Sequence, residues 1–284
     1  HYQATHSNDQ IMIPLRFSNL APSFAIFGHT RLARPPLGEM FRWIFQPGKE
    51  ARAAKYIQTK TNNEKFLEVI FKNYDKVFYY PVTASWVDLC QTIDECFNPD
   101  NWHHFISPET PIGSDDVVVD CGAAEGLFSI VAAQNAKMVY AIEPVPFWHE
   151  SLNKTFQHYE NIELMPYGVG HKNAEMQMTN DEIYSRITSD GGIRISVRTL
   201  DCLFFEKDIP VSFIKADVEG FEFQTLLGAE NLIRKNRPKI SITVYHDTNH
   251  FLEIMDYLRN IHQDYTFKLR GIAANGNPIL LQAY

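Results

Sequence analysis

Apolar residues recur at helical spacing in the first third of the chain. They fall on one face within residues 37–45, within 67–78 and within 86–97, which predicts three helices. Ser85 stands just before the third of these stretches, where its side chain can cap the first helical turn. Residues 1–110 are therefore expected to form a mainly helical extension.

From residue 111 to residue 284 the pattern changes to short β-branched runs that alternate with helical stretches. The runs lie at 117–120, 138–143, 162–167, 211–217 and 239–246. A helical stretch at 251–258 follows the last of them. This alternation is typical of an α/β domain in which helices cover both faces of a parallel sheet.

Two further strand patterns close the chain, at 265–273 and at 277–284. The sequence NGNP at 275–278 predicts a turn between them, so the two strands are expected to form an antiparallel hairpin. Doubly wound sheets bind ligands outside the carboxyl ends of their strands. The residues at those ends are therefore the first candidates for a functional site.

Composition and charge narrow the classes of function. The net charge of −8 and the absence of a basic run argue against a nucleic-acid-binding surface. No apolar run is long enough for a membrane span. The four cysteines lack both metal-binding spacing and the density of a disulfide scaffold, so we expect reduced thiols and a cytoplasmic location.

The first strand of the α/β region runs into the sequence DCGAAEG. A GxGxxG pattern begun at Gly122 meets alanine and leucine where the second and third glycines should stand, which argues against NAD. The turn suits a smaller ligand that has both an amino group and a carboxylate, with Asp120 addressing the ammonium and turn amides the carboxylate. The turn residues expected at this ligand are Asp120, Gly122, Ala123, Glu125 and Gly126.

Glu143 ends the next strand, 23 residues after Asp120. Its carboxylate is placed to accept hydrogen bonds from both hydroxyls of a ribose. An amino-acid site beside a ribose site predicts S-adenosylmethionine as the cofactor. Tyr167, at the end of the third strand, is expected to contact the adenine, with core packing as the alternative.

These motifs resemble the FkbM-type methyltransferases. The resemblance covers about residues 113–284 and rests on VVVDCGAAEGLFSI, YAIEP, VRTLD, FIKADVEGFEFQTLLGA and SITVYHD. It implies the Rossmann-like class I methyltransferase fold, with a seven-stranded, mostly parallel sheet and a reversed last strand. It also implies O-methylation of a sugar, glycan or secondary metabolite. Residues 1–110 lie outside the resemblance and would form a lid, a substrate wall or a contact in a homo-oligomer.

Lys215, Asp217 and Glu219 alternate along the fourth strand and into the turn after it, so we expect them at the mouth of the same crevice. An alcohol must lose its proton as it attacks a methyl group, and Asp217, Glu219 and His246 are the expected catalytic groups. Lys215 is expected to pair with a carboxylate. No metal-binding set is assigned, although a divalent cation held by Asp217, Glu219, His246 and Asp247 is an open alternative.

The sequence thus predicts an S-adenosylmethionine-dependent O-methyltransferase that acts on a hydroxyl group of a small molecule or glycan. One alternative is a carboxyl or amino methyltransferase of the same fold. A second is a module that binds S-adenosylmethionine without catalysis and whose N-terminal part serves assembly. Detection of S-adenosylhomocysteine in the presence of hydroxylated acceptors would separate catalysis from binding alone.

Overall fold

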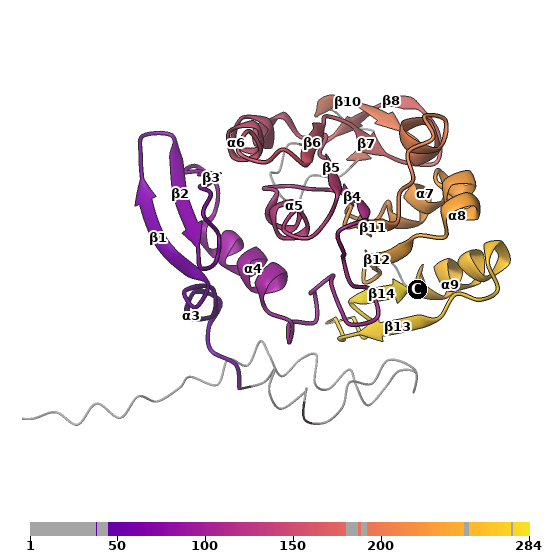
Figure 1. Cartoon of the computed structure of the whole chain (residues 1–284), viewed down its shortest axis with the longest axis horizontal. Coiled ribbons are helices and arrows are strands. Elements are labelled where there is room, and N and C mark those ends of the chain that lie inside the picture. The colour runs from indigo at the N-terminus through magenta and orange to yellow at the C-terminus, as the bar shows by residue number, and fades with distance from the viewer. Residues whose placement is uncertain (1–37, 39–44, 180–186, 189–191, 247–249, 274) are drawn as a thin grey trace, which may run out of the picture.

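The computed structural model describes residues 38, 45–179, 187–188, 192–246, 250–273 and 275–284 of the chain. Its centre is a seven-stranded sheet in the order β13-β14-β12-β11-β4-β5-β6. The N-terminal elements lie at the left of the view in Figure 1, and the closing hairpin forms the edge of the sheet opposite β6.

Six strands of the central sheet run in the same direction, and β14 is the reversed strand, antiparallel to both of its neighbours β12 and β13. The fold class predicted from the sequence, with its reversed last strand, is therefore confirmed. The seven strands are β4 (Val117–Cys121), β5 (Met138–Ile142), β6 (Ile162–Met165), β11 (Phe213–Ala216), β12 (Lys239–Thr243), β13 (Phe267–Arg270) and β14 (Leu280–Ala283).

Each central strand begins and ends within a few residues of its predicted range. The reason is burial on both faces, because β4, β11 and β14 have no exposed position and read as continuous apolar runs. Side chains that point to opposite faces enter two separate apolar cores. Asp120, Lys215 and Gln282 are the buried polar exceptions on β4, β11 and β14.

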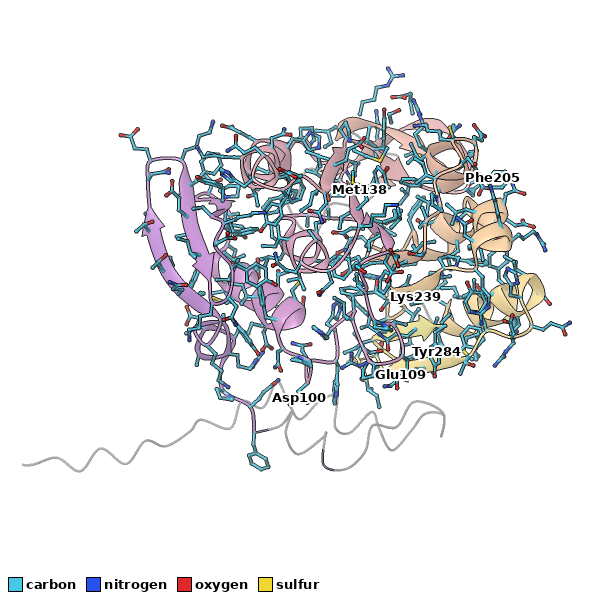
Figure 2. All side chains as sticks on the ribbon, viewed as in Figure 1. Asp100, Glu109, Met138, Phe205, Lys239 and Tyr284 are labelled. Carbon is cyan, nitrogen blue, oxygen red and sulfur yellow. The ribbon has the colours of Figure 1, made fainter. Side chains whose placement is uncertain are left out.

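Helices cover both faces of the sheet, as predicted. One core contains residues of α5 (Leu127–Ala132) and α6 (Pro146–Phe156), and the other contains residues of α7 (Glu222–Leu227), α8 (Glu230–Asn236) and α9 (His250–Ile261). A short π-helical turn, η3 (Asp201–Phe205), adds Leu203 and Phe204 to the second core. Side chains fill the space between these layers (Figure 2).

The N-terminal region differs from the prediction in one respect. Residues 67–78 are not a helix, because the three-stranded antiparallel sheet β1 (Ile57–Asn62), β2 (Phe66–Phe71) and β3 (Phe78–Pro81) occupies this segment. The true period in β2 is two, since Leu67, Val69 and Phe71 are buried while Glu68 and Ile70 are partly exposed. Several aromatic and aliphatic residues within twelve positions also match a helical face by chance, and that match misled the prediction.

The predicted helix at 86–97 is confirmed as α4 (Trp86–Phe97), and the Ser85 hydroxyl accepts a hydrogen bond from the Asp88 amide at 3.3 Å. A shorter helix, α3 (Lys49–Ala53), packs beside it. The predicted helix at 37–45 lies outside the described residues except for residues 38 and 45.

A second, four-stranded sheet was not predicted. It contains β7 (Gly168–Val169), β10 (Ile193–Arg198), β8 (Ala174–Met178) and β9 (Ile187–Thr188), in that order. It lies at the top of the view in Figure 1, after β6 in the chain. Its two longer strands, β8 and β10, alternate apolar and polar residues and are half-exposed, so they lack the apolar runs that identify the central strands.

Two smaller expectations concern the membrane and the cysteines. Among the described helices, none combines the length and the apolar character that a membrane crossing requires. All four cysteines are free thiols, and three of them are buried.

Candidate active site

One pocket lies at the carboxyl ends of β4, β5 and β11. The predicted cofactor residues Gly122, Ala123, Glu125, Glu143 and Tyr167 all line it. The pocket continues to the predicted catalytic carboxylates at the end of β11 and to the polar side of α4. Most of the candidate residues therefore line one cavity.

The turn after β4 depends on two glycines. Gly122 has a φ of +74°, and a Cβ atom there would lie 2.0 Å from the backbone oxygen of Asp217. Gly126 has a φ of +88°, and a Cβ atom there would meet Leu152 at 2.6 Å. Glycine is the residue that tolerates both the positive φ and the close approach. The turn therefore brings the chain after β4 directly against the chain after β11.

Glu143 is held rigidly at the end of β5. One carboxylate oxygen accepts a hydrogen bond from the Ala124 amide and the other from the Val145 amide, each at 2.8 Å. Burial raises the pKa of Glu143 to about 7, against the opposing effect of these two amides. Each oxygen keeps a second lone pair, so the carboxylate can still accept a pair of ribose hydroxyls.

Glu125 lines the same pocket and is only 4% exposed. Burial raises the pKa of its carboxyl group to about 8. A bound cation or hydrogen-bond donor would favour the ionised form and lower that pKa. Glu125 is thus a carboxyl group whose charge depends on what occupies the pocket.

Asp120 is placed differently from the sequence expectation. It is fully buried and, among the described residues, does not belong to the pocket lining. Its carboxylate lies 2.9 Å from Lys215 Nζ and accepts a hydrogen bond from the Ser129 hydroxyl at 2.6 Å. Lys215 therefore pairs with a carboxylate as expected. Its partner is Asp120, directly opposite in the register of β4 and β11.

Lys215 also supports the glycine turn. Its ammonium donates a hydrogen bond to the Gly122 carbonyl at 2.7 Å, and it lies above the Phe105 and Phe128 rings. Burial alone would lower the pKa of Lys215, but the Asp120 carboxylate raises it above its ordinary value. The ammonium is therefore a fixed charge that ties β4, β11 and the turn together.

The predicted catalytic residues form one cluster after β11 and β12. Asp217 and Glu219 line the pocket, and Glu219 has a positive φ of 53°. His246 is not in the lining, but its Nε2 lies 3.5 Å from a Glu219 oxygen and its Nδ1 lies 3.2 Å from Glu222 Oε1. Asp247 lies outside the described residues.

Burial would lower the pKa of His246, but Glu219 and Glu222 raise it to about 10. Glu222 was missed in the sequence, although the spacing of acids in VEGFE is a signal that could have indicated it. It is fully buried, and Oε1 accepts hydrogen bonds from the Val218 and Gly220 amides at 3.1 and 3.3 Å. Glu222 therefore shapes the turn that carries Glu219.

The opposite wall of the pocket comes from α4 and the segment after it. Asp88, Gln91, Thr92 and Glu95 of α4 line the pocket, at positions that share one helical face. His103 lines it too, and its ring lies 5.6 Å from the Tyr245 ring. The α4 residues were not predicted individually, although helical periodicity is a signal for the face that they share.

The pocket lining is acidic. Its carboxyl groups are those of Asp88, Glu95, Glu125, Glu143, Asp217 and Glu219. Lys215 is the one lysine among the described lining residues, and its charge is paired with Asp120. The arrangement suits ligands that are cationic or rich in hydrogen-bond donors.

Comparison with known proteins gives the following matches. Residues 120–269 match the family model described as the methyltransferase FkbM domain. A crystal structure of methyltransferase FkbM from Methylobacillus flagellatus is similar in fold, with a TM-score of 0.50 and 23% identity over 70% of this chain and 54% of that one. The TYW2 structure from Methanocaldococcus jannaschii in complex with AdoMet has a TM-score of 0.40 and 17% identity, covering 78% of this chain and 87% of that one.

An uncharacterized protein of Methanocaldococcus jannaschii is 37% identical over 59 residues, which are 20% of this chain and 23% of that protein. The chain therefore matches less than a quarter of this curated relative and about half of the Methylobacillus flagellatus structure.

Proposed function

Because the chain belongs to the FkbM methyltransferase family, we propose that it transfers a methyl group from S-adenosylmethionine to a hydroxyl group of a sugar, glycan or secondary metabolite. The observation that carries the proposal is a single pocket lined by Glu143 at one end and by Asp217 and Glu219 at the other. Such a pocket can hold the cofactor and a hydroxylated acceptor side by side.

Cofactor binding is assigned to the ends of β4 and β5. Glu143 accepts the two ribose hydroxyls, and Tyr167 lies beside the adenine. The turn from Gly122 to Gly126 surrounds the amino-acid part, where Glu125 takes the role that the sequence suggested for Asp120. S-adenosylmethionine supplies a methyl group made electrophilic by a positively charged sulfur.

Methyl transfer needs an acceptor oxygen in line with the methyl carbon and a group that receives the hydroxyl proton. We assign proton acceptance to Glu219, because its carboxylate lines the pocket and forms an ion pair with His246, which lies outside the pocket lining. Asp217 lines the pocket next to it and orients the acceptor. The oxygen–carbon bond forms as the carbon–sulfur bond breaks, and the proton moves to Glu219.

We assign the acceptor wall to α4. Its Gln91 and Thr92 offer neutral hydrogen-bonding groups, and Asp88 and Glu95 accept bonds from further hydroxyls. The acidic lining and the net charge of −8 also favour a small molecule or glycan over a nucleic acid as acceptor.

The test is a purified enzyme assay with S-adenosylmethionine and a panel of sugars, alcohols, carboxylic acids and amines. We expect S-adenosylhomocysteine together with an acceptor that has gained a methoxy group, identified by mass spectrometry and NMR. A base-labile methyl ester or an N-methyl product would replace the proposal with one of the alternative chemistries. Cofactor binding without turnover on any acceptor would favour the non-catalytic module.

The assigned base has its own test in the same assay. We expect Glu219→Gln to reduce turnover by about 10²–10⁴. Its dissociation constant for S-adenosylmethionine should stay within about twofold of wild type. Near-full turnover in this variant would remove Glu219 from the role of base.

A further inference from the structure

We propose that Asp217, Glu222 and His246 bind a divalent metal ion at the acceptor end of the pocket. One potential ligand atom from each of these residues lies within 4.8 Å of the others. The site itself is independent of the methyl-transfer reaction, and only the role given to the ion below rests on the proposed function.

The three residues come from separate elements that the fold brings together. Asp217 follows β11, Glu222 begins α7, and His246 follows β12. The Thr243 hydroxyl is within hydrogen-bond distance of Asp217 Oδ1 at 3.1 Å and of Glu222 Oε1 at 3.0 Å. The hydroxyl can donate a hydrogen bond to only one carboxylate at a time, but its position between them limits the movement of both. Groups that hydrogen-bond to metal ligands have the same effect in protein metal sites.

Unsatisfied polar atoms in the cluster point to a missing ligand. Glu222 is fully buried, yet its Oε2 has no hydrogen-bond partner among the described residues. The two ring nitrogens of His246 lie 3.2 and 3.5 Å from carboxylate oxygens of Glu222 and Glu219 but form no well-aligned hydrogen bond within the described part of the chain, although the side chain is only 15% exposed. Buried polar atoms usually have a partner, and a metal ion is a partner for both types of group.

The charges lead to the same conclusion. Three carboxylates, those of Asp217, Glu219 and Glu222, lie around one imidazole. Even a protonated His246 leaves an excess of negative charge in this largely buried cluster. A divalent cation would neutralise it. Two carboxylates and one imidazole suit Mn²⁺ better than Mg²⁺, because imidazole is a softer ligand than oxygen.

Asp217 is the only one of the three that also lines the pocket. An ion bound there would have positions open toward the acceptor, and a hydroxyl oxygen bound to it would lose its proton more easily. Glu219, beside the ion, would remain the group that receives the proton.

The test is Mn²⁺ binding to the full chain without cofactor or acceptor, measured by the loss of the free Mn²⁺ signal in electron paramagnetic resonance. We expect one ion per chain with a dissociation constant below about 100 μM. His246→Gln and Asp217→Asn should each weaken binding at least tenfold. Asp88→Asn, which removes a carboxylate from the opposite wall, and His171→Gln, which removes an exposed histidine, are controls that should bind like wild type.

Absence of stoichiometric Mn²⁺ binding at millimolar concentration would overturn the proposal, as would equal binding by the two cluster variants. The cluster would then be a metal-free ion-pair network. If circular dichroism shows that the variants do not fold, the wild-type protein loaded with Co²⁺ decides, since a histidine ligand gives a hyperfine-shifted, exchangeable ring N–H resonance. Methyl transfer that survives a chelator would remove the catalytic role and leave the binding result standing.

Discussion

Glu143 and Glu125 are carboxyl groups that folding removes from water at the cofactor end of the pocket. Burial raises the pKa of both, to about 7 for Glu143 and about 8 for Glu125. Shifts of this kind are common where a ligand later supplies the missing partner. Substitution of Glu143 therefore tests cofactor binding, and substitution of Glu125 tests the pH dependence of stability.

Glu143→Ala should weaken S-adenosylmethionine binding by about tenfold or more, because the lost hydrogen bonds to a charged acceptor contribute about 1.5–3 kcal/mol each. Isothermal titration calorimetry measures this directly. Stability should fall by about 1–3 kcal/mol as well, since the Ala124 and Val145 amides lose their acceptor. Glu163→Ala, an exposed change on β6, is the control. Unchanged affinity in a folded Glu143→Ala protein would exclude Glu143 from the cofactor site.

Glu125→Gln should change the pH dependence of stability. The folded pKa of about 8 lies above the ordinary value of 4.5, so the native state keeps a proton that the unfolded chain releases. The stability that this protonation contributes is present below pH 4.5 and is lost as the pH rises through about 8.

Glutamine stays neutral at every pH, so the ligand-free variant should be more stable than wild type at pH 9 by on the order of 2–4 kcal/mol. The two proteins should differ by no more than about 0.5 kcal/mol near pH 4.5. Urea denaturation at the two pH values makes the comparison. A difference that is the same at both would show that Glu125 does not titrate in this way.

Single residues could be predicted where a strand end determined their position. Gly122, Glu143 and Asp217 follow buried apolar runs, and parallel strands bring such ends together. Asp120 was expected at the ligand, but it lies within β4 opposite Lys215 of β11, and its carboxylate pairs with the Lys215 ammonium. The contact between Glu222 and His246 depends on how α7 packs against the end of β12, and local sequence patterns do not contain that information.

At the level of elements, the turn after β4 is the contact that assembles the pocket. Gly122→Ala would place a Cβ atom 2.0 Å from the Asp217 carbonyl oxygen, in a backbone with φ of +74°. We expect a loss of about 2–4 kcal/mol in the free energy of unfolding. Cofactor affinity should fall too, since β4 and β11 must move apart to make room for the alanine side chain.

Gly113→Ala is the matched control, because a Cβ atom at Gly113 would be 3.8 Å from its nearest neighbour, Asp116 Oδ2. Its stability should stay within about 0.5 kcal/mol of wild type. Urea denaturation followed by circular dichroism compares the two variants. Equal stability of both would mean that the turn relaxes without cost.

Elements could be predicted where one periodicity dominated. The central strands are apolar on both faces, and α4 combines a helical stripe with a Ser85 cap, so both were identified. In β2 a strand pattern and a helical pattern overlap, and pairing with β1 and β3 decides between them. The half-exposed strands β8 and β10 alternate apolar and polar residues, so they lack the continuous apolar runs by which the central strands were identified.

At the scale of the whole molecule, the boundary predicted at residue 110 does not separate two hydrophobic cores. One apolar cluster contains Phe71, Phe78 and Leu89 of the N-terminal region together with Leu127 and Leu152 of the α/β region. Elements that share a core unfold together. The N-terminal region is therefore expected to be an integral part of the folded unit.

We accordingly expect a single unfolding transition in urea, with the same midpoint by tryptophan fluorescence and by far-ultraviolet circular dichroism. Phe71→Ala should lower both midpoints equally, by the equivalent of about 3–5 kcal/mol. Val82→Ala, a change at a residue that is 44% exposed, should leave them in place. Two separate transitions, with only the first affected by Phe71→Ala, would show that the regions fold independently.

The acidic lining of the pocket has a consequence for the order in which molecules leave it. Methyl transfer turns a positively charged sulfonium into a neutral thioether, so the nucleoside that remains has lost one unit of positive charge. The ionised carboxylates of the lining attract this neutral product less than they attract the cationic reactant. We therefore expect S-adenosylhomocysteine to dissociate readily from the enzyme and to inhibit it only weakly.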